Sequence, residues 1–276
     1  MKTYIMADPV RYPRMTTAEL RESFLVDGLH KPGEIVLNYV DLDRTIIGMA
    51  TPMHSPITLP NEPELRAKYF TERRELGVLN IGGEGGMRIG DTGYKLDTLD
   101  ALYIGRGNAE VSVVSENPEW PAIFYILSYP AHAEYPTTLI RKDEAQSITI
   151  GAPETINSRT ITKYIHAGSV QTCQLVMGVT QLHPGSAWNT MPPHTHMRRS
   201  EVYLYFDLDP TARVMHMMGP ANESRHLFMA DKEAVVSPGW SMHAGVGTRA
   251  YQFCWGMGGE NQDYDDMDKI AIADLK

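Results

Sequence analysis

The chain has 276 residues, of which 42% are hydrophobic and 21% are charged, an ordinary composition for a globular protein with a substantial core. Its 34 acidic residues outnumber its 25 basic ones, and the resulting charge of -9 argues against a general nucleic-acid binder or an affinity for anionic membranes. No stretch approaches the roughly 20 consecutive apolar residues of a membrane span, and the N-terminal residues lack the apolar run of a signal peptide. We therefore expect a cytoplasmic protein with no nucleic-acid or membrane partner.

The first half of the chain has two helical signals among short predicted strands. Residues 16–25 begin with Thr16 and Glu19 at the spacing of a capping box. Residues 64–76 have apolar side chains at helical spacing, and Gly77 is suited to end a helix there. The predicted strands of this half are residues 35–39, 45–49, 109–114 and 122–128.

The second half is predicted to carry the chemistry. Residues 130–155 contain proline, a charged run and a Gly-Ala-Pro turn, which indicate a linker zone, and we divide the chain into domains 1–140 and 141–276. Seven of the ten histidines follow this zone. The predicted strands are residues 159–166, 170–182, 201–208, 213–218, 226–229, 234–237 and 250–255. Many short strands broken by turns, with few helices, predict an all-β barrel or jelly roll.

The segment M-P-P-H-T-H-M-R-R-S-E-V-Y carries a set of potential metal ligands. His194 and His196 are two residues apart, so in a β-strand they project from the same face. Glu201 follows at an odd step, so a bulge or turn near residues 198–200 is needed to bring it to the same ion. A Pro-Gly turn downstream precedes His243. Three imidazoles and a carboxylate suit zinc, manganese, iron or nickel, and we predict a metal site.

Longer segments resemble the bacterial 5-keto-4-deoxyuronate isomerases, the 4-deoxy-L-threo-5-hexosulose-uronate ketol-isomerases of the cupin superfamily. The matching segments are H-T-H-x-R-R-x-E-V-Y at 194–203, R-H-L-F-M at 225–229, S-P-x-W-S-x-H-x-G-V-G-T at 237–248 and W-G-M-x-G-E-N-Q-x-x-D-D-M-D at 255–268. The chain departs from the family at Gly239, where a small polar residue is expected. The resemblance implies two cupin-like double-stranded β-helix barrels, a bicupin, with a few short helices. It further implies an N-terminal barrel without metal ligands, one zinc ion per chain in the C-terminal barrel, and a homohexamer.

The activity implied by the resemblance is a zinc-dependent ketol-isomerization in pectin and uronate breakdown. The reaction converts 5-dehydro-4-deoxy-D-glucuronate to 3-deoxy-D-glycero-2,5-hexodiulosonate by moving hydrogen between neighbouring carbons. Removing a proton beside a carbonyl is the hard step, and a metal ion assists it by stabilising negative charge on oxygen. The candidates for moving the proton are Glu201, Lys163 and Tyr251.

The substrate's carboxylate requires a cationic partner. Arg198 shares the parity of the two nearby histidines, so on a regular strand it would face the same cavity, where its guanidinium could bind a carboxylate in bidentate fashion. Arg199 is a substitute for this role. Tyr203 shares the parity of Glu201 and is a candidate for contact with the substrate.

Two other classes of protein are compatible with this ligand set. A cupin with three histidines and one glutamate can be an iron or nickel dioxygenase, which oxygen consumption would reveal. The barrel could also be a non-catalytic sugar-binding module. The length of the resemblance favours the isomerase over both alternatives.

Overall fold

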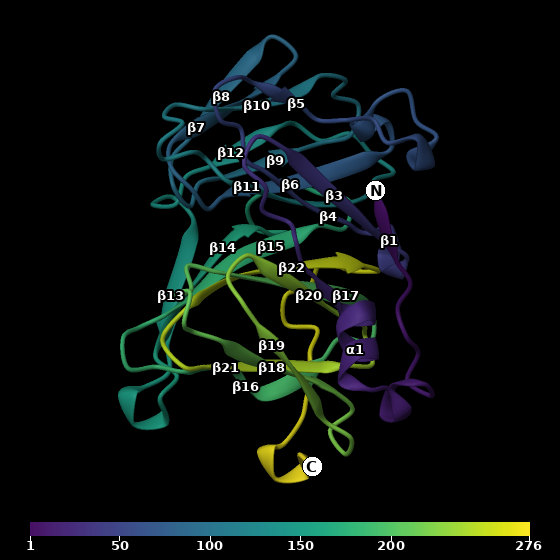
Figure 1. Ribbon diagram of the computed structural model, residues 1–276, viewed down its shortest axis with the longest axis vertical. Helices are drawn as coiled ribbons and strands as arrows, with labels where there is room; N and C mark the ends of the chain where they lie inside the picture. Colours follow the sequence, from purple (N-terminus) through teal and green to yellow (C-terminus); the bar gives the residue numbers. More distant parts are fainter. The chain divides into compact units, whose positions relative to one another are not determined.

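The computed structural model describes residues 1–276, and its secondary structure consists mainly of β-strands with one α-helix (Figure 1). The chain forms two compact units, each with two β-sheets. The first unit comprises Met1–Thr3, Gly28–Ala145 and Tyr164–Val176, and the second comprises Tyr4–Asp27, Gln146–Lys163 and Met177–Lys276. The longest segment of the first unit ends at Ala145, near the predicted division at residue 140, but Tyr4–Asp27 belongs to the second unit and Tyr164–Val176 to the first. Two units of this kind match the predicted all-β, bicupin architecture.

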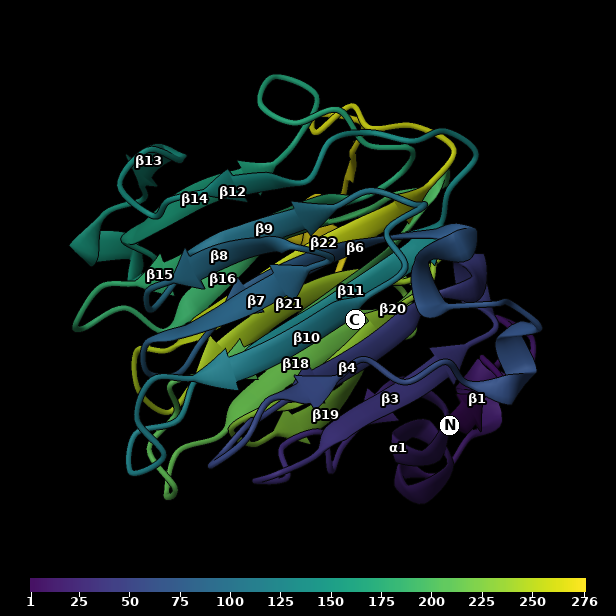
Figure 2. The same cartoon turned by 90° about the horizontal axis from the view of Figure 1, so that it is seen from above.

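The first unit has a seven-stranded and a four-stranded sheet. In spatial order the larger sheet contains β1 (Lys2–Tyr4), β3 (Ile35–Val40), β4 (Ile46–Ala50), β11 (Phe124–Pro130), β6 (Arg74–Asn80), β9 (Ala101–Ile104) and β12 (Thr138–Ile140). The smaller contains β5 (Ile57–Thr58), β10 (Val111–Ser115), β7 (Gly85–Ile89) and β8 (Thr92–Leu96). Figure 2 shows the central strands of the larger sheet running side by side. Apolar side chains from both sheets, such as Leu76 and Val113, form one buried cluster.

The second unit repeats this plan. Its seven-stranded sheet contains β13 (Gln146–Ile150), β14 (Arg159–Ile165), β15 (Val176–Leu182), β22 (Gln252–Gly259), β17 (Arg199–Phe206), β20 (Glu233–Ser237) and β2 (Leu25–Val26). Its five-stranded sheet contains β19 (Arg225–Met229), β18 (Val214–Gly219), β21 (Met242–Gly247), β16 (Trp188–Thr195) and β23 (Asp268–Lys269). Every residue of β17 is buried, and antiparallel partners flank this strand on both sides.

The predicted first helix is confirmed as α1 (Thr17–Phe24), drawn in purple in Figure 1. Thr16 Oγ1 accepts a hydrogen bond from the Glu19 N–H (3.3 Å), and the Glu19 carboxylate accepts one from the Thr16 N–H (2.8 Å), which completes the capping box. Phe24 makes an edge contact with Trp240, their ring centroids lying 6.3 Å apart. The helix thus packs against the turn that precedes His243.

Six short 3-10 helices complete the secondary structure. They are Tyr12–Arg14, Leu42–Arg44, Pro63–Leu65, Phe70–Glu72, Pro153–Thr155 and Ile272–Asp274. None of the helices combines the length and apolar character needed to cross a membrane.

The helix predicted over residues 64–76 is wrong. That stretch contains only two 3-10 turns, and β6 begins at Arg74. Gly77, expected to end the helix, is instead in the middle of β6, opposite Leu127 on β11 and Tyr103 on β9. Strand pairing on both sides of a fully buried segment outweighs the helical spacing of its apolar residues.

The other predicted strands are confirmed within a few residues, except that the one predicted over 170–182 begins only at Val176. The buried Glu75 carboxylate accepts hydrogen bonds from the backbone N–H groups of Cys173 (2.7 Å), Gln174 (2.8 Å) and Leu175 (3.0 Å). These N–H groups bond to a side chain in place of a neighbouring strand. The apolar pattern of residues 170–175 does not indicate these hydrogen bonds to Glu75.

Candidate metal centre

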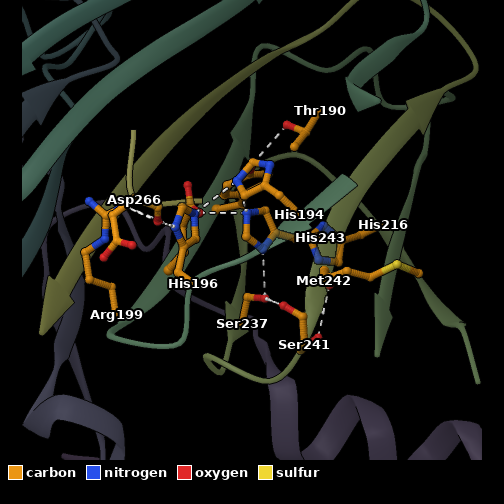
Figure 3. A network of polar contacts seen from close by, with 12 residues as sticks. Thr190, His194, His196, Arg199, His216, Ser237, Ser241, Met242, His243 and Asp266 are labelled. Atoms are coloured by element: carbon orange, nitrogen blue, oxygen red, sulfur yellow. Dashed lines mark hydrogen bonds and ion pairs between the residues drawn. The ribbon is translucent and has the colours of Figure 1, made fainter. Parts of the chain in front are cut away.

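The four predicted metal ligands come from both sheets of the second unit. His194 on β16 and His243 on β21 are direct cross-strand partners in the five-stranded sheet. His196 follows the end of β16, and Glu201 lies on β17 of the seven-stranded sheet. Figure 3 shows the three imidazoles pointing toward one another. The side chains therefore converge between the two sheets of this barrel.

A turn brings Glu201 to the histidines, as its odd step from His196 requires. The turn lies at Met197 and Arg198, and the Arg199 N–H donates to the His196 carbonyl (3.2 Å) to close it. The chain changes from one sheet to the other at this turn. The predicted interruption is confirmed, although it begins slightly before the expected residues 198–200.

The ligand atoms are close enough to share one ion. His194 Nε2 lies 3.0 Å from His196 Nε2 and 3.1 Å from His243 Nε2. Glu201 Oε2 lies 3.0 Å from His196 Nε2 and 2.8 Å from His243 Nε2. All four atoms are within 4.8 Å of one another. Tetrahedral bonds of about 2.0–2.1 Å would separate neighbouring ligands by roughly 3.3 Å, so this group can bind a metal ion.

Neighbouring groups orient two of the imidazoles. His196 Nδ1 lies 2.9 Å from the Asp266 carbonyl, and Arg199 Nη2 donates to the same oxygen (3.0 Å). His243 Nδ1 lies 3.2 Å from Ser237 Oγ. A proton on Nδ1 of His196 can be donated to the carbonyl, which leaves the Nε2 lone pair free for an ion.

The protonation states also suit a metal ion. Burial, reinforced by His243, lowers the pKa of His194 to about 2, so this imidazole is neutral near pH 7. Burial of Glu201 would raise its pKa, but the charge of His243 and hydrogen bonds from both His196 and His243 hold the pKa well below its ordinary value. A neutral imidazole at His194 and an ionised carboxylate at Glu201 are forms that bind metals.

A cavity of about 530 Å³ adjoins the ligands, and its lining includes His194, His196 and Glu201. Three cationic side chains also line it: Arg159, Lys163 and Lys269. Lys163 Nζ lies 3.8 Å from the centre of the Tyr264 ring. An anionic substrate would therefore meet local positive charge here, despite the net negative charge of the chain.

The other predicted site residues divide into two groups. Lys163 and Tyr203 line the cavity, and the Tyr203 hydroxyl lies 3.1 Å from Thr190 Oγ1. Tyr251 is buried away from the lining, and its hydroxyl accepts a hydrogen bond from Asn189 Nδ2 (2.5 Å).

Neither predicted arginine is among the lining residues. Arg198 pairs with Asp266, its Nε donating at 2.7 Å, because β16 ends at Thr195 and the alternation that would have aimed Arg198 into the cavity is interrupted. Arg199 is buried beside His196, with its Nη2 3.1 Å from Nδ1 of that histidine.

Two of the cavity's cations were not predicted. Arg159 shares strand parity with Lys163 on β14, and this signal was present in the sequence. Lys269 lies on β23, where it is the cross-strand partner of His194. Nothing in the local sequence around Lys269 indicates that pairing.

Paired sheets that enclose three histidines and one glutamate define a cupin-type barrel with a candidate metal site. The chain belongs to the KduI/IolB family, whose family model matches residues 29–273.

Individual relatives agree with this membership over the full length of the chain. A Lachnoclostridium phytofermentans protein is 50% identical over 276 residues, with 100% of both chains covered. An Opitutus terrae protein is 47% identical over 277 residues, again with 100% of both covered. Both are named 4-deoxy-L-threo-5-hexosulose-uronate ketol-isomerase. The crystal structure of an IolB-like protein from Salmonella typhimurium has the same fold, with a TM-score of 0.72, 13% identity, and coverage of 90% of this chain and 97% of that one.

Proposed function

We propose that the chain is a metal-dependent ketol-isomerase that converts 5-dehydro-4-deoxy-D-glucuronate to 3-deoxy-D-glycero-2,5-hexodiulosonate. The observation that carries this proposal is the convergence of His194, His196, Glu201 and His243 beside a cavity with cationic side chains. Such a cavity suits a substrate with a carboxylate at one end and a carbonyl next to an ionisable C–H at the other. The names of the full-length relatives support the same reaction.

We assign the four convergent side chains as ligands of one zinc ion per chain. Three imidazole nitrogens and one carboxylate oxygen are donors that suit zinc. When bound, the ion would supply positive charge beside the oxygens that become negative as the proton is removed. Because Glu201 would be bound to this ion, its carboxylate would not be free to carry a proton. Its low pKa makes Glu201 a poor proton donor near pH 7.

We propose that Arg159 binds the substrate's carboxylate. It is half-buried in the cavity lining, and one guanidinium nitrogen, Nη1, donates to the Asn157 carbonyl (2.8 Å). That contact anchors the side chain and leaves other N–H groups for a carboxylate, which a guanidinium binds well in bidentate fashion. Arg198, by contrast, is already paired with Asp266.

Lys163 is the proposed proton carrier. Among the three candidates for this role, Tyr251 is not in the cavity lining and Glu201 belongs to the ligand set. The Lys163 ammonium lies against the Tyr264 ring, which holds its position through a cation–π contact. In its neutral amine form this side chain can take a proton from one substrate carbon and become the ammonium, and the ammonium can then return that proton to the neighbouring carbon. General acid–base catalysis of this kind contributes about 10²–10⁴-fold to a rate.

The proposal includes two further expectations: a homohexamer, which the family resemblance implies, and a cytoplasmic location. Light scattering on the purified protein tests the first, and cell fractionation tests the second.

The experiment that tests the function is an isomerisation assay on the purified protein, with product identified by NMR and metal measured by elemental analysis. We expect conversion of the deoxy-keto-uronate, loss of conversion after chelation, and recovery when zinc is restored. The Lys163→Met variant should keep its metal and lose about 10²-fold or more in kcat. Failure of the metal-loaded wild type to convert this substrate would reject the proposal, and oxygen consumption by an iron-loaded protein would replace it with the dioxygenase.

A further inference from the structure

A second cavity lies within the first unit, and none of its lining residues belongs to the candidate metal centre. Its volume is about 470 Å³, within the range of roughly 300–1,000 Å³ typical of small-molecule sites. Three arginines line it: Arg44, which precedes β4, and Arg73 and Arg74 at the start of β6. The lining also includes Tyr39 and the apolar side chains of Leu65 and Phe70.

Arg74 is a buried cation whose hydrogen-bond partners are all neutral. The residue is only 7% exposed. Its Nε donates to Ser128 Oγ (3.1 Å), and its Nη2 donates to the carbonyls of Ser128 (2.8 Å) and Arg44 (2.6 Å). Burial lowers the pKa of Arg74 to about 10, so the guanidinium remains charged at neutral pH. Arg74 forms no ion pair within the protein. A buried cation without a directly paired anion is costly, and an anion in the cavity would compensate it.

The other two arginines add to the positive charge. Arg73 Nη2 donates to the backbone carbonyls of Leu65 (3.0 Å) and Arg66 (2.6 Å), while its Nη1 is 3.9 Å from the Glu72 carboxylate. Arg44 is exposed and has no ion-pair partner in the structure. The one carboxylate in the lining, Glu64, accepts a hydrogen bond from the Met1 ammonium (3.2 Å).

The backbone that presents Arg44 is held in an unfavourable conformation. Asp43 and Arg44 are consecutive left-handed residues, with φ of +49° and +53°. Non-glycine residues in this conformation are strained, and they cluster at functional sites. This conformation places the Arg44 carbonyl where Arg74 Nη2 can donate to it, so the two arginines are positioned together.

We propose that this cavity is a binding site for a small organic anion, whose charged group pairs with Arg74 and Arg44 and whose body rests on Tyr39, Leu65 and Phe70. The cavity is too large for an inorganic ion alone, and its lining combines charged with apolar side chains. Guanidinium groups recognise both carboxylates and phosphate esters. The anion could therefore be a sugar acid or a sugar phosphate, and the test below distinguishes these two ligands. The site does not depend on the isomerase assignment.

The test is calorimetric titration of the full-length, metal-loaded protein with galacturonate, glucose 6-phosphate and inorganic phosphate, and with glucose as the neutral control. Titrations are repeated in an Arg159→Gln background, so that binding in the metal-centre cavity is separated from binding here. We expect at least one organic anion to bind saturably in that background, and glucose not to bind. Tighter binding of galacturonate would identify the ligand as a sugar acid, and tighter binding of glucose 6-phosphate would identify it as a sugar phosphate.

Substitutions in the lining test whether the anion binds in this cavity. Arg44→Gln should weaken it tenfold or more without changing isomerase turnover, while Arg88→Gln, an exposed arginine on β7, should leave it unchanged. If Arg44→Gln does not fold, Ala67→Trp fills the cavity and keeps all three arginines, and it should abolish binding. No saturable binding by any organic anion up to millimolar concentration, or binding that survives both variants, would overturn the proposal.

Discussion

His194 and His243 face each other across the β16–β21 pair, with their Nε2 atoms 3.1 Å apart. The pairing of β16 with β21 shifts register between Asn189 and His194, so the two histidines meet after an irregular stretch. Their apposition depends on strand register, and Glu201 on the other sheet completes the group. The site is therefore a property of the assembled barrel, although its ligands can be recognised in the sequence.

Replacing His243 should remove the metal and the activity together. His243→Ala leaves three ligands and removes one of the two imidazoles that contact the buried Glu201 carboxylate. We therefore expect less than about 0.1 metal per chain and a loss in turnover of about 100-fold or more. Elemental analysis and the isomerisation assay measure both. His226→Ala, at an exposed residue of β19, is the matched control. Wild-type turnover in His243→Ala would reject the ligand assignment.

Metal removal should lower the stability of the second unit. A ligand that binds only the folded state stabilises it by about 2.7 kcal/mol when its concentration is 100 times Kd. We expect chelation to shift the denaturation midpoint of the wild type downward by a corresponding amount. Chemical denaturation followed by tryptophan fluorescence, with and without chelator, measures this shift. An identical midpoint in the two conditions would contradict it, as would an equal shift in His243→Ala.

Substitution of Arg159 should affect substrate binding more than the chemical step. Hydrogen bonds to charged groups are worth about 1.5–3 kcal/mol, so Arg159→Gln should raise KM by about 10–100-fold with a smaller change in kcat. Arg198→Gln is the informative comparison, because Arg198 pairs with Asp266 and is outside the cavity lining. Steady-state kinetics on both variants show whether Arg159 or Arg198 contributes to substrate binding. A large KM effect confined to Arg198→Gln would reverse the assignment.

A side chain at Gly239 should disturb the metal centre through the backbone. A Cβ atom there would lie 2.7 Å from the His196 carbonyl and 3.3 Å from the Met197 carbonyl. Gly239→Ala must therefore push the turn that carries His196, and we expect about tenfold weaker metal retention against a competing chelator. Gly93→Ala, where a Cβ meets nothing within 4 Å, is the control. Unchanged metal retention in Gly239→Ala would show that the turn adapts.

The stability of the metal-free protein should fall as the pH is lowered, in part because of His216. Burial lowers the pKa of His216 to about 3, and its Nδ1 lies 2.8 Å from the Tyr205 hydroxyl oxygen. The unfolded chain protonates this histidine below about pH 6.5, while the folded chain does not do so until about pH 3. Between these values His216 therefore reduces stability by up to about 1.4 kcal/mol per pH unit.

The measurement compares wild type with His216→Gln by urea denaturation at several pH values from 5 to 7, with chelator present. We expect the free energy of unfolding to fall less steeply with decreasing pH in the variant. Parallel curves would show that His216 is protonated in the folded state as readily as in the unfolded one.

The convergence of the four candidate ligands could be predicted because its signal is local. Two histidines on one face, a glutamate shortly after them and a turn before the last histidine are readable in sequence order. The failure at residues 64–76 has the opposite cause, since β6 exists through pairing with β11 and β9, which are distant in sequence.

The cationic residues of the metal-centre cavity also could not all be predicted from local sequence alone. Arg198 lies next to the ligands in sequence, but a turn directs it to Asp266. Lys269 reaches the cavity from β23 by pairing with β16, more than 70 residues earlier in the chain. Strand parity predicts a direction only while the strand continues, and it cannot predict which distant strand supplies a neighbour.

The division of the ligands between two sheets has a consequence for how the protein can change over evolution. An ion held by His194, His243 and Glu201 would cross-link the sheets, and its binding free energy would add to that of the barrel. A chain that is well supplied with metal could then accept core substitutions that cost about 1–2 kcal/mol each, whereas the same variants would unfold when metal is scarce. The metal content of the cell would thereby set how much sequence variation the second unit tolerates.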